Sequence, residues 1–137
     1  MSESFWRIVD SVEFPLLVTN GEDGFPRARP MTVLDRDGGT LWFATSRRSA
    51  KVAQIRKDPR VAILFVKTEQ FNYATLYGRA EVMDDEERKR AYWRDDWKDD
   101  WPRGAFDEDY TLLKVTGLRG SYYHGYTGEA EEVRLVG

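Results

Sequence analysis

The architecture follows most directly from residues 40–67, TLWFATSRRSAKVAQIRKDPRVAILFVK, in which a short helix separates two strands. The first six residues favour a strand, and residues 61–66 form a continuous apolar run, as in strands that are buried on both faces. Between the strands, Val52 and Ile55 recur at helical spacing, and Pro59 ends the helix. The helix is therefore an insertion in a strand-rich chain.

Two more strands precede this segment, and turns rich in Asp and Gly connect them. They are predicted at residues 16–19 and 25–34, and a short helix at residues 4–12 precedes both. Because the connecting turns are tight, we expect these two strands and the strand at residues 40–45 to form an antiparallel meander. The second strand would then lie directly beside the third.

The second half of the chain continues the pattern of strands with inserted helices. Strands are predicted at residues 71–83, with a bulge at Gly78, and at residues 110–116. Between these two strands, the acidic residues 84–87 begin a helix that runs to about Trp97 or Trp101. Because no βαβ rhythm occurs, the expected fold is α+β, an antiparallel β-barrel of about six strands with peripheral helices.

Length and composition indicate a single domain that spans residues 1–137. The chain has a mass of 16.0 kDa, is 41% hydrophobic and 33% charged, and carries a formal net charge of −3. This charge argues against general nucleic-acid binding, and the apolar content excludes a disordered tail. The longest apolar runs are only as long as a strand, so we expect no membrane span, no signal peptide and a cytoplasmic protein. The charged residues 127–137 are expected to be peripheral.

Cysteine is absent, and histidine occurs once, as His124. This composition excludes disulfides, cysteine-ligated zinc, iron–sulfur clusters, thiol catalysis and multi-histidine metal sites. The acidic residues between positions 95 and 100 are interspersed with cations and suit a solvated helix face, so no metal site is expected. His124 is interpreted as a hydrogen-bonded residue, and no catalytic acid or base is assigned.

The junction between the strand and the helix, TSRRSAK, has the composition of an anion site. A helix start offers free N–H groups and the positive end of the helix dipole. Here two hydroxyls and three cations accompany it, namely Ser46, Ser49, Arg47, Arg48 and Lys51. Such a site is best suited to phosphate. The alternative is a capped surface helix whose arginines are solvated.

Two arginines in the second predicted strand strengthen the phosphate interpretation. Strand alternation places Arg27, Arg29 and Met31 on one face. If this strand neighbours the third one, Arg29 approaches the helix start at Lys51, whereas Arg27 is expected to face water. Pro30 lacks a backbone donor, so the strand is expected at an edge or a bulge, where backbone groups are free to meet a ligand.

Aromatic side chains are a second signal. Trp93, Trp97 and Trp101 recur every four residues and would form one stripe on the predicted helix. Such a stripe favours packing on the barrel or on a second subunit. The alternative is that one of the indoles covers a flat heterocycle.

Six segments in a fixed order carry a family resemblance over residues 5–123. They are Gly24–Met31, Leu41–Thr45, Ser49–Val52, Asp58–Val61, Tyr77–Val82 and Trp101–Gly104. In order and spacing they resemble the FMN-binding split-barrel proteins related to pyridoxamine 5'-phosphate oxidase, and within them the general stress protein branch. The resemblance implies a split β-barrel and a homodimer that holds FMN in a groove between the two chains.

The resemblance also implies a set of cofactor contacts. Arg29 and Lys51 would hold the phosphate of FMN, with hydrogen bonds from Ser49 and Ser46. Pro30, Met31 and Thr32 would run beside the flavin ring and the ribityl chain. The adjacent strand would supply backbone and side-chain contacts from Phe43, Ala44 and Thr45. The partner chain would contribute Tyr73 and Trp101.

The implied function is that of an FMN-dependent oxidoreductase with a small-molecule redox partner. Vitamin-oxidising members hold their pyridoxal-type substrate with a C-terminal segment of Trp and Arg residues, which this chain lacks, so pyridoxine phosphate is not the expected substrate. Haem, which other branches bind, would rest on His124 alone and is not expected. The alternatives are FAD or a deazaflavin as cofactor, a deazaflavin-dependent reductase, a non-catalytic flavin-binding reservoir or stress sensor, and a small β-barrel interaction protein.

Overall fold

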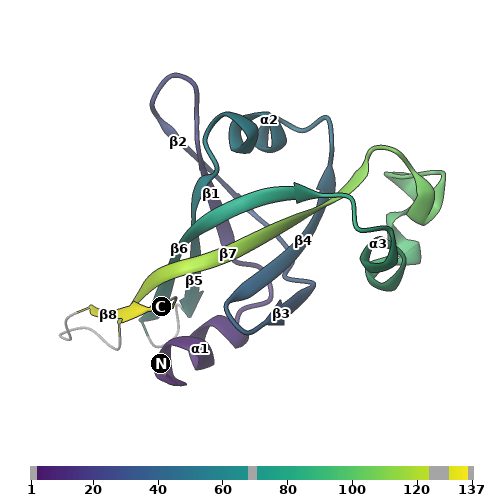
Figure 1. Cartoon of the computed structure of the whole chain (residues 1–137). Helices are drawn as coiled ribbons and strands as arrows, with labels where there is room; N and C mark the ends of the chain where they lie inside the picture. The colour runs from purple at the N-terminus through teal and green to yellow at the C-terminus, as the bar shows by residue number, and fades with distance from the viewer. Residues whose placement is uncertain (1–2, 68–70, 124–129, 136–137) are drawn as a thin grey trace.

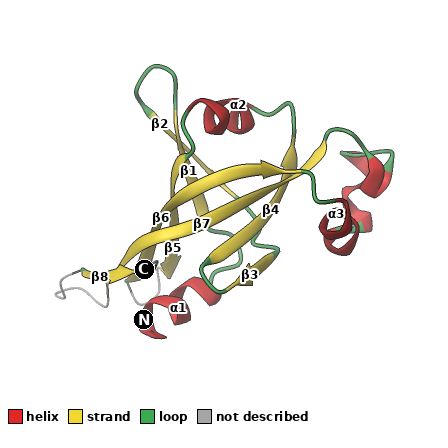
Figure 2. Ribbon diagram, in the orientation of Figure 1, coloured by secondary structure: helices red, strands yellow, loops and turns green. Residues whose placement is uncertain are grey.

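The computed structural model describes residues 3–67, 71–123 and 130–135. Within them, eight strands form one sheet with three α-helices around it (Figures 1 and 2). The strands are β1 (Leu16–Asn20), β2 (Pro26–Pro30), β3 (Asp35–Asp37), β4 (Thr40–Ser46), β5 (Arg60–Lys67), β6 (Asn72–Met83), β7 (Tyr110–Tyr123) and β8 (Glu131–Arg134). The helices are α1 (Glu3–Asp10), α2 (Ala50–Lys57) and α3 (Glu86–Tyr92), followed by 3₁₀ helices at Asp95–Asp99 and Gly104–Phe106. None of the helices in these ranges has the length and apolar character needed to cross a membrane.

The strand order is β2-β1-β5-β6-β7-β4-β3, and β8 pairs with β7. Every pairing is antiparallel, and no ladder joins β2 to β3 within the described ranges, so the sheet stays open. This confirms the expected α+β antiparallel split barrel, with eight strands rather than about six. β3 lies where the sequence predicts a turn, between the strands expected at residues 25–34 and 40–45. β8 lies in the segment expected to be peripheral, yet its Val133 packs into the core.

The predicted meander is wrong in a way that matters for the site. β1 pairs with β2, but β2 forms one edge of the sheet, whereas β4 lies near the opposite edge between β7 and β3. The strand predicted at residues 25–34 ends at Pro30. Beyond it, the N–H groups of Met31 and Val33 still donate to the carbonyls of Pro15 and Glu13, so this stretch continues beside the segment that precedes β1. The N–H of Leu34 then donates to the carbonyl of Trp42, which brings the chain to β4 on the far side of the sheet.

The bulge predicted at Gly78 is confirmed. The pairing of β6 with β7 shifts its register between Tyr77 and Gly78. A Cβ atom at Gly78 would collide with the carbonyl oxygen of Thr116, so the backbone of β7 lies too close for any side chain at this position. The two long strands cross the whole molecule side by side (Figure 1).

One face of the sheet and α1 enclose the main core. Inward-pointing residues of β1 and β5, such as Leu17 and Ile63, are fully buried, and Phe5 of α1 packs against them. The outer face of β5 is not covered in the same way, because Val66 is 42% exposed. The burial of both faces that is expected for residues 61–66 is therefore not achieved within a single chain.

The predicted tryptophan helix is wrong, although the tryptophans do cluster. α3 ends at Tyr92 because Trp93 adopts extended backbone, with φ −56° and ψ 136°. The ring centroids of Trp93 and Trp97 are 5.6 Å apart, and those of Trp97 and Trp101 are 5.7 Å apart. Together with Trp42 they form a second, smaller cluster of apolar side chains.

Candidate functional site

The start of α2 presents an unsatisfied hydroxyl group. Ser49 is the N-cap residue, but its side chain makes no capping bond. Its Oγ is buried and has no hydrogen-bond partner among the described residues. A buried hydroxyl in this state is costly, because it has given up its bonds to water. The first turn of α2 also carries no acidic residue, so the positive end of the helix dipole is not offset there.

Lys51 lies in the first turn of α2 and is half-buried. Its Nζ donates to Thr45 Oγ1 at 2.7 Å. Burial lowers the pKa of Lys51, and the nearby charge of Arg29 lowers it further. Both effects disfavour the charged form of Lys51, so a negatively charged partner would stabilise its ammonium group.

Arg29 reaches the same place from β2. Its guanidinium donates to Thr19 Oγ1 at 2.8 Å and to Gln54 Oε1 at 3.3 Å. Burial lowers the pKa of Arg29, and the charge of Arg27 adds to the effect. Throughout the described ranges, no carboxylate forms an ion pair with Arg29 or Lys51. We call Arg29, Thr45, Ser49 and Lys51 the anion cradle.

The route that brings Arg29 to Lys51 differs from the predicted one. β2 and β4 are not neighbours, so the approach does not come from adjacent strands. Instead α2 packs against β1, where Thr19 Oγ1 donates to Gln54 Oε1 at 2.6 Å, and the side chain of Arg29 reaches these two residues from β2 (Figure 1). Sequence reasoning missed both of these linking residues. The signals were a polar residue in an apolar strand, Thr19, and an amide three positions after Lys51 on the helix, Gln54.

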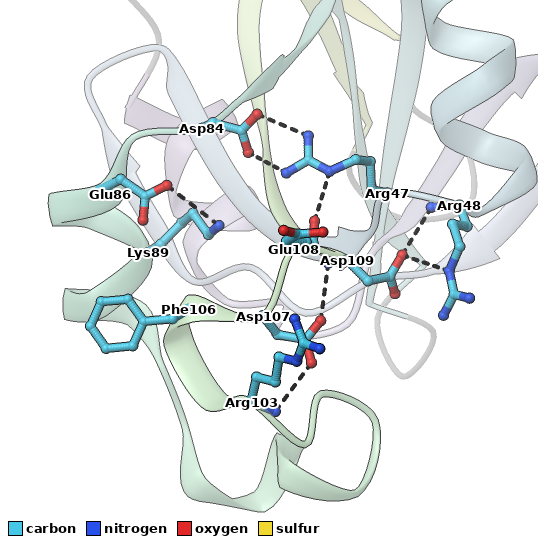
Figure 3. Close-up of a pocket in the computed structure, with 10 residues that line it drawn as sticks. All are labelled: Arg47, Arg48, Asp84, Glu86, Lys89, Arg103, Phe106, Asp107, Glu108 and Asp109. Carbon is cyan, nitrogen blue, oxygen red and sulfur yellow. Dashed lines mark hydrogen bonds and ion pairs between the residues drawn. The ribbon is translucent and has the colours of Figure 1, made fainter.

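Arg47 and Arg48, which the sequence groups with Lys51, are not part of the cradle. The guanidinium of Arg47 donates to both oxygens of Asp84, at 2.8 and 2.6 Å, and that of Arg48 donates to Asp109 at 3.1 Å. Figure 3 shows these pairs at the wall of a separate hollow of about 760 Å³. The hydrogen bonds that Arg47 donates to Asp84 raise the pKa of Arg47. Both arginines already have carboxylate partners, so neither is free to bind an anion in the way that the sequence predicts.

The hydroxyl of Ser46 also already has a carboxylate partner. Its Oγ donates its single proton to Asp109 Oδ2 at 2.6 Å, so it is not a free donor for a phosphate. Thr45 differs, because its Oγ1 accepts from Lys51 and keeps its own proton. Of the two serines that the sequence offers, the structure therefore leaves Ser49 available.

A hollow of about 250 Å³ is lined in part by residues that follow or precede cradle residues in the sequence. The described residues that line it are Pro30, Met31, Thr32, Leu34, Ala44, Trp97, Asp100 and Trp101. Trp101 is 8% exposed, and its Nε1 donates to Asp109 Oδ2 at 3.1 Å. Trp101 thus lines the same hollow as Pro30 and Ala44 of its own chain, and its contact with a flavin across a dimer interface stays a prediction.

Two other candidate residues lie away from the cradle and the hollow. Phe43 is fully buried in the main core, so its side chain is not available to a ligand. Tyr73 stacks on Tyr123 with ring centroids 5.2 Å apart, on the outer face of the sheet. His124 lies outside the described residues. Among the residues that are described, no cluster of acidic or histidine side chains has the geometry of a metal site.

Comparison with known proteins identifies similar sequences and structures. The family model described as "Pyridoxamine 5'-phosphate oxidase like" matches residues 1–133. No curated protein sequence gives a significant match. Among solved structures, the chain is similar to a protein from Clostridium acetobutylicum that is related to general stress protein 26 of B. subtilis, in the pyridoxinephosphate oxidase family. The identity is 29%, the TM-score is 0.80, and 96% of each chain is covered.

Two further structures extend the comparison. The chain is 26% identical to general stress protein 26 from Bacillus anthracis str. Sterne, with a TM-score of 0.79 and 97% of each chain covered. It shares its fold with a heme binding protein from Mycobacterium smegmatis, at 21% identity and a TM-score of 0.75. That match covers 96% of this chain and 57% of the other.

Proposed function

The chain belongs to the pyridoxamine 5'-phosphate oxidase-like family, and we propose that it binds FMN and acts as a flavin-dependent oxidoreductase. One observation carries the proposal. The anion cradle brings two half-buried cations to a buried, unpartnered hydroxyl, and the described residues supply no carboxylate to neutralise them. A phosphate group would supply both the missing charge and the missing acceptors.

The donors in the cradle suit a phosphate monoester. Its oxygens can accept from the hydroxyl of Ser49, the ammonium of Lys51 and the guanidinium of Arg29. Arg29 offers a planar fork and Lys51 a point charge, so together they can bind two different oxygens of one phosphate. Thr45 adds a further donor, because its hydroxyl proton is not used in the bond with Lys51.

The hollow would receive the ring system of the flavin. The cradle and the hollow use neighbouring residues of the same two strands, since Arg29 is followed by Pro30 on β2 and Thr45 is preceded by Ala44 on β4. Trp97 contributes an indole to the hollow wall, and a flat heterocycle packs well on such a surface. This arrangement would anchor the cofactor at its phosphate end and cover its ring at the other.

FMN would supply the electron and hydride chemistry when bound, and the chain would bind and orient it. Among the described residues that line the hollow, Asp100 alone has an ionisable side chain. The tryptophan walls would exclude water from one side of the ring. The redox partner would then be a small molecule that approaches the open side of the hollow.

The outer face of the sheet supports a homodimer. Leu16 and Val66 are 37% and 42% exposed, and Leu16 lies directly opposite Leu64, so apolar side chains continue across β1 and β5. A second copy on this face would complete the burial that the apolar run at residues 61–66 predicts. Tyr73 lies opposite Val66 on the same face, where it would contact the partner chain.

A flavin titration of the cofactor-free protein tests the binding proposal. FMN, FAD and riboflavin are titrated separately while flavin fluorescence is followed, and the FMN complex is then mixed anaerobically with reduced nicotinamides. We expect FMN to bind more tightly than riboflavin, because only FMN carries the phosphate, and we expect its absorption band to bleach on reduction.

Each other outcome has a defined meaning. Equal affinity for FMN and riboflavin contradicts the assignment of the cradle to a phosphate. Tight FMN binding without reduction by any common donor supports the flavin reservoir instead. Displacement of FMN by a deazaflavin at lower concentration supports the deazaflavin-dependent reductase.

A further inference from the structure

Asp109 forms hydrogen bonds with residues of both the phosphate side and the ring side of the proposed site. It precedes β7, and its side chain is 15% exposed. Its Oδ2 accepts from Ser46 Oγ at 2.6 Å and from Trp101 Nε1 at 3.1 Å. Its Oδ1 accepts from the backbone N–H and the side-chain Nε of Arg48, both at 3.1 Å. One carboxylate therefore holds three residues that belong to two different parts of the site.

These contacts reach both functional parts of the site. Ser46 ends β4 and Arg48 lies in the loop that leads from β4 into α2, so both lie in the segment that carries Thr45, Ser49 and Lys51 of the anion cradle. Trp101 is a wall of the hollow. The carbonyl of Asp109 also accepts from the backbone N–H of Arg47 at 2.7 Å, which fixes the loop at a second point. Figure 3 shows Asp109 turned toward Arg48 at this loop.

We propose that Asp109 is a positioning residue that fixes the loop of the anion cradle and the indole of Trp101 relative to one another. This inference rests on the proposed flavin function. Asp109 accepts four hydrogen bonds, so its negative charge is shared between the loop and the ring wall. A movement of Trp101 is then coupled to a movement of Ser46 through one oxygen atom.

Only an ionised carboxylate can make this set of contacts. Burial acts to raise the pKa of Asp109, but hydrogen bonds from Ser46, Arg48 and Trp101 outweigh it and lower the pKa to about 2. An asparagine in this place has one acceptor oxygen and one NH2 group, so it cannot accept from Arg48 and from the Ser46–Trp101 pair at the same time. One of the connections that hold the two parts of the site would then be lost.

The test compares Asp109→Asn with Trp101→Phe and Ser46→Ala. Trp101→Phe keeps an aromatic ring but removes the N–H that reaches Asp109. The dissociation constants of FMN and riboflavin are measured for each variant, and thermal unfolding is followed in parallel. Asp107→Asn is the matched control, because Asp107 accepts from the backbone N–H of Asp109 but contacts neither Ser46 nor Trp101.

We expect Asp109→Asn to weaken FMN by about 10-fold and riboflavin by about 3-fold, because riboflavin uses the hollow alone whereas FMN uses the cradle as well. Trp101→Phe should weaken riboflavin to a similar degree, and Ser46→Ala should weaken FMN alone. The double variant Asp109→Asn/Trp101→Phe should show no further loss of riboflavin affinity. Asp107→Asn should leave both affinities unchanged. If Asp109→Asn does not fold, the single variants at Trp101 and Ser46 still decide the matter, since each breaks one of the two connections.

Two results overturn the inference. One is unchanged affinity for both flavins in Asp109→Asn despite lower thermal stability, which would make the role structural. The other is full additivity of Asp109→Asn with Trp101→Phe. A wild-type protein that binds no flavin would instead overturn the proposed function, and so the two failures are distinguishable.

Discussion

Arg29 on β2 lies close enough to Lys51 on α2 for its charge to lower the pKa of that lysine. Each of the two side chains donates to neutral oxygens, from Thr19 and Gln54 for Arg29 and from Thr45 for Lys51. Two partly buried cations without a carboxylate oppose folding. An anion that binds to both removes this penalty, so stability and ligand affinity are linked through one pair of side chains.

Lys51→Ala and Arg29→Ala should each weaken FMN binding by about 1.5–3 kcal/mol, the typical contribution of a hydrogen bond to a charged group. Riboflavin affinity should be nearly unchanged, because riboflavin has no phosphate. Isothermal titration of the cofactor-free variants with both ligands measures the difference. Equal losses for the two ligands would show that the residues act through folding.

Two neighbouring cations serve as controls for this experiment. Lys57 lies at the far end of α2 and pairs with Glu22, and Arg27 lies on β2 and pairs with Asp23. Both pairs are exposed, so Lys57→Ala and Arg27→Ala should change FMN affinity by less than about 0.5 kcal/mol. A larger effect would indicate that general surface charge, rather than the cradle, attracts the ligand.

FMN binding should take up a proton at alkaline pH. In the free protein, burial and Arg29 hold the pKa of Lys51 below the ordinary value of 10.5, and a bound phosphate restores it. FMN affinity should therefore fall as pH rises through the lowered pKa. The stability of the free protein should change in the opposite sense, because the penalty of charged Lys51 is relieved between that lowered pKa and 10.5.

Titration calorimetry in buffers of different ionisation enthalpy measures this proton uptake directly. The uptake should disappear in Lys51→Gln, which cannot titrate. If the wild-type protein and Lys51→Gln take up the same number of protons, the lowered pKa of Lys51 does not contribute to binding.

Ser49→Ala should separate stability from affinity. Because Ser49 Oγ makes no capping bond and has no partner within the described residues, its removal should leave the free energy of unfolding unchanged or slightly higher. FMN affinity should nevertheless fall by about 0.5–1.5 kcal/mol. Chemical denaturation and flavin titration give the two quantities, and a stability loss above about 1 kcal/mol would mean that Ser49 acts as an ordinary helix cap.

Gly78→Ala should destabilise the fold by more than about 1 kcal/mol, because the new methyl group would meet the carbonyl oxygen of Thr116 in β7. Gly39→Ala is the matched control. A Cβ atom at Gly39 would have no atom within 4 Å, so this change should be nearly neutral. Denaturant unfolding of both variants checks the contrast, and equal stability would argue against the close approach of β6 and β7.

Val66→Lys should convert the proposed homodimer to a monomer, because it places a charge in the centre of the apolar outer face. Phe106→Lys is the control, since Phe106 is 69% exposed but lies in the 3₁₀ helix before β7, away from this face. Light scattering after gel filtration gives the mass of each variant. A wild-type monomer, or a Val66→Lys dimer, would show that this face does not join two copies.

Several elements could be predicted because their signals are local. The strands at β1, β5, β6 and β7, the bulge at Gly78 and the helix that Ser49 begins all follow from side-chain periodicity and turn residues. The errors occur where long-range pairing decides the outcome. Pro30 ends its strand early, and β4 pairs with β7 rather than with β2. No local pattern in residues 40–46 specifies which strand lies beside them.

The sequence by itself determined the class of the fold, the types of side chain available for an anion site and the absence of cysteine chemistry. The tertiary structure alone decided which of the cations stay free. Arg47 and Arg48 are neutralised by carboxylates 37 and 61 positions away in the sequence, whereas Arg29 and Lys51 meet no such partner within the described residues. The reason is physical: the interaction between two charges depends on their distance and burial in space, and neither quantity follows from separation along the chain.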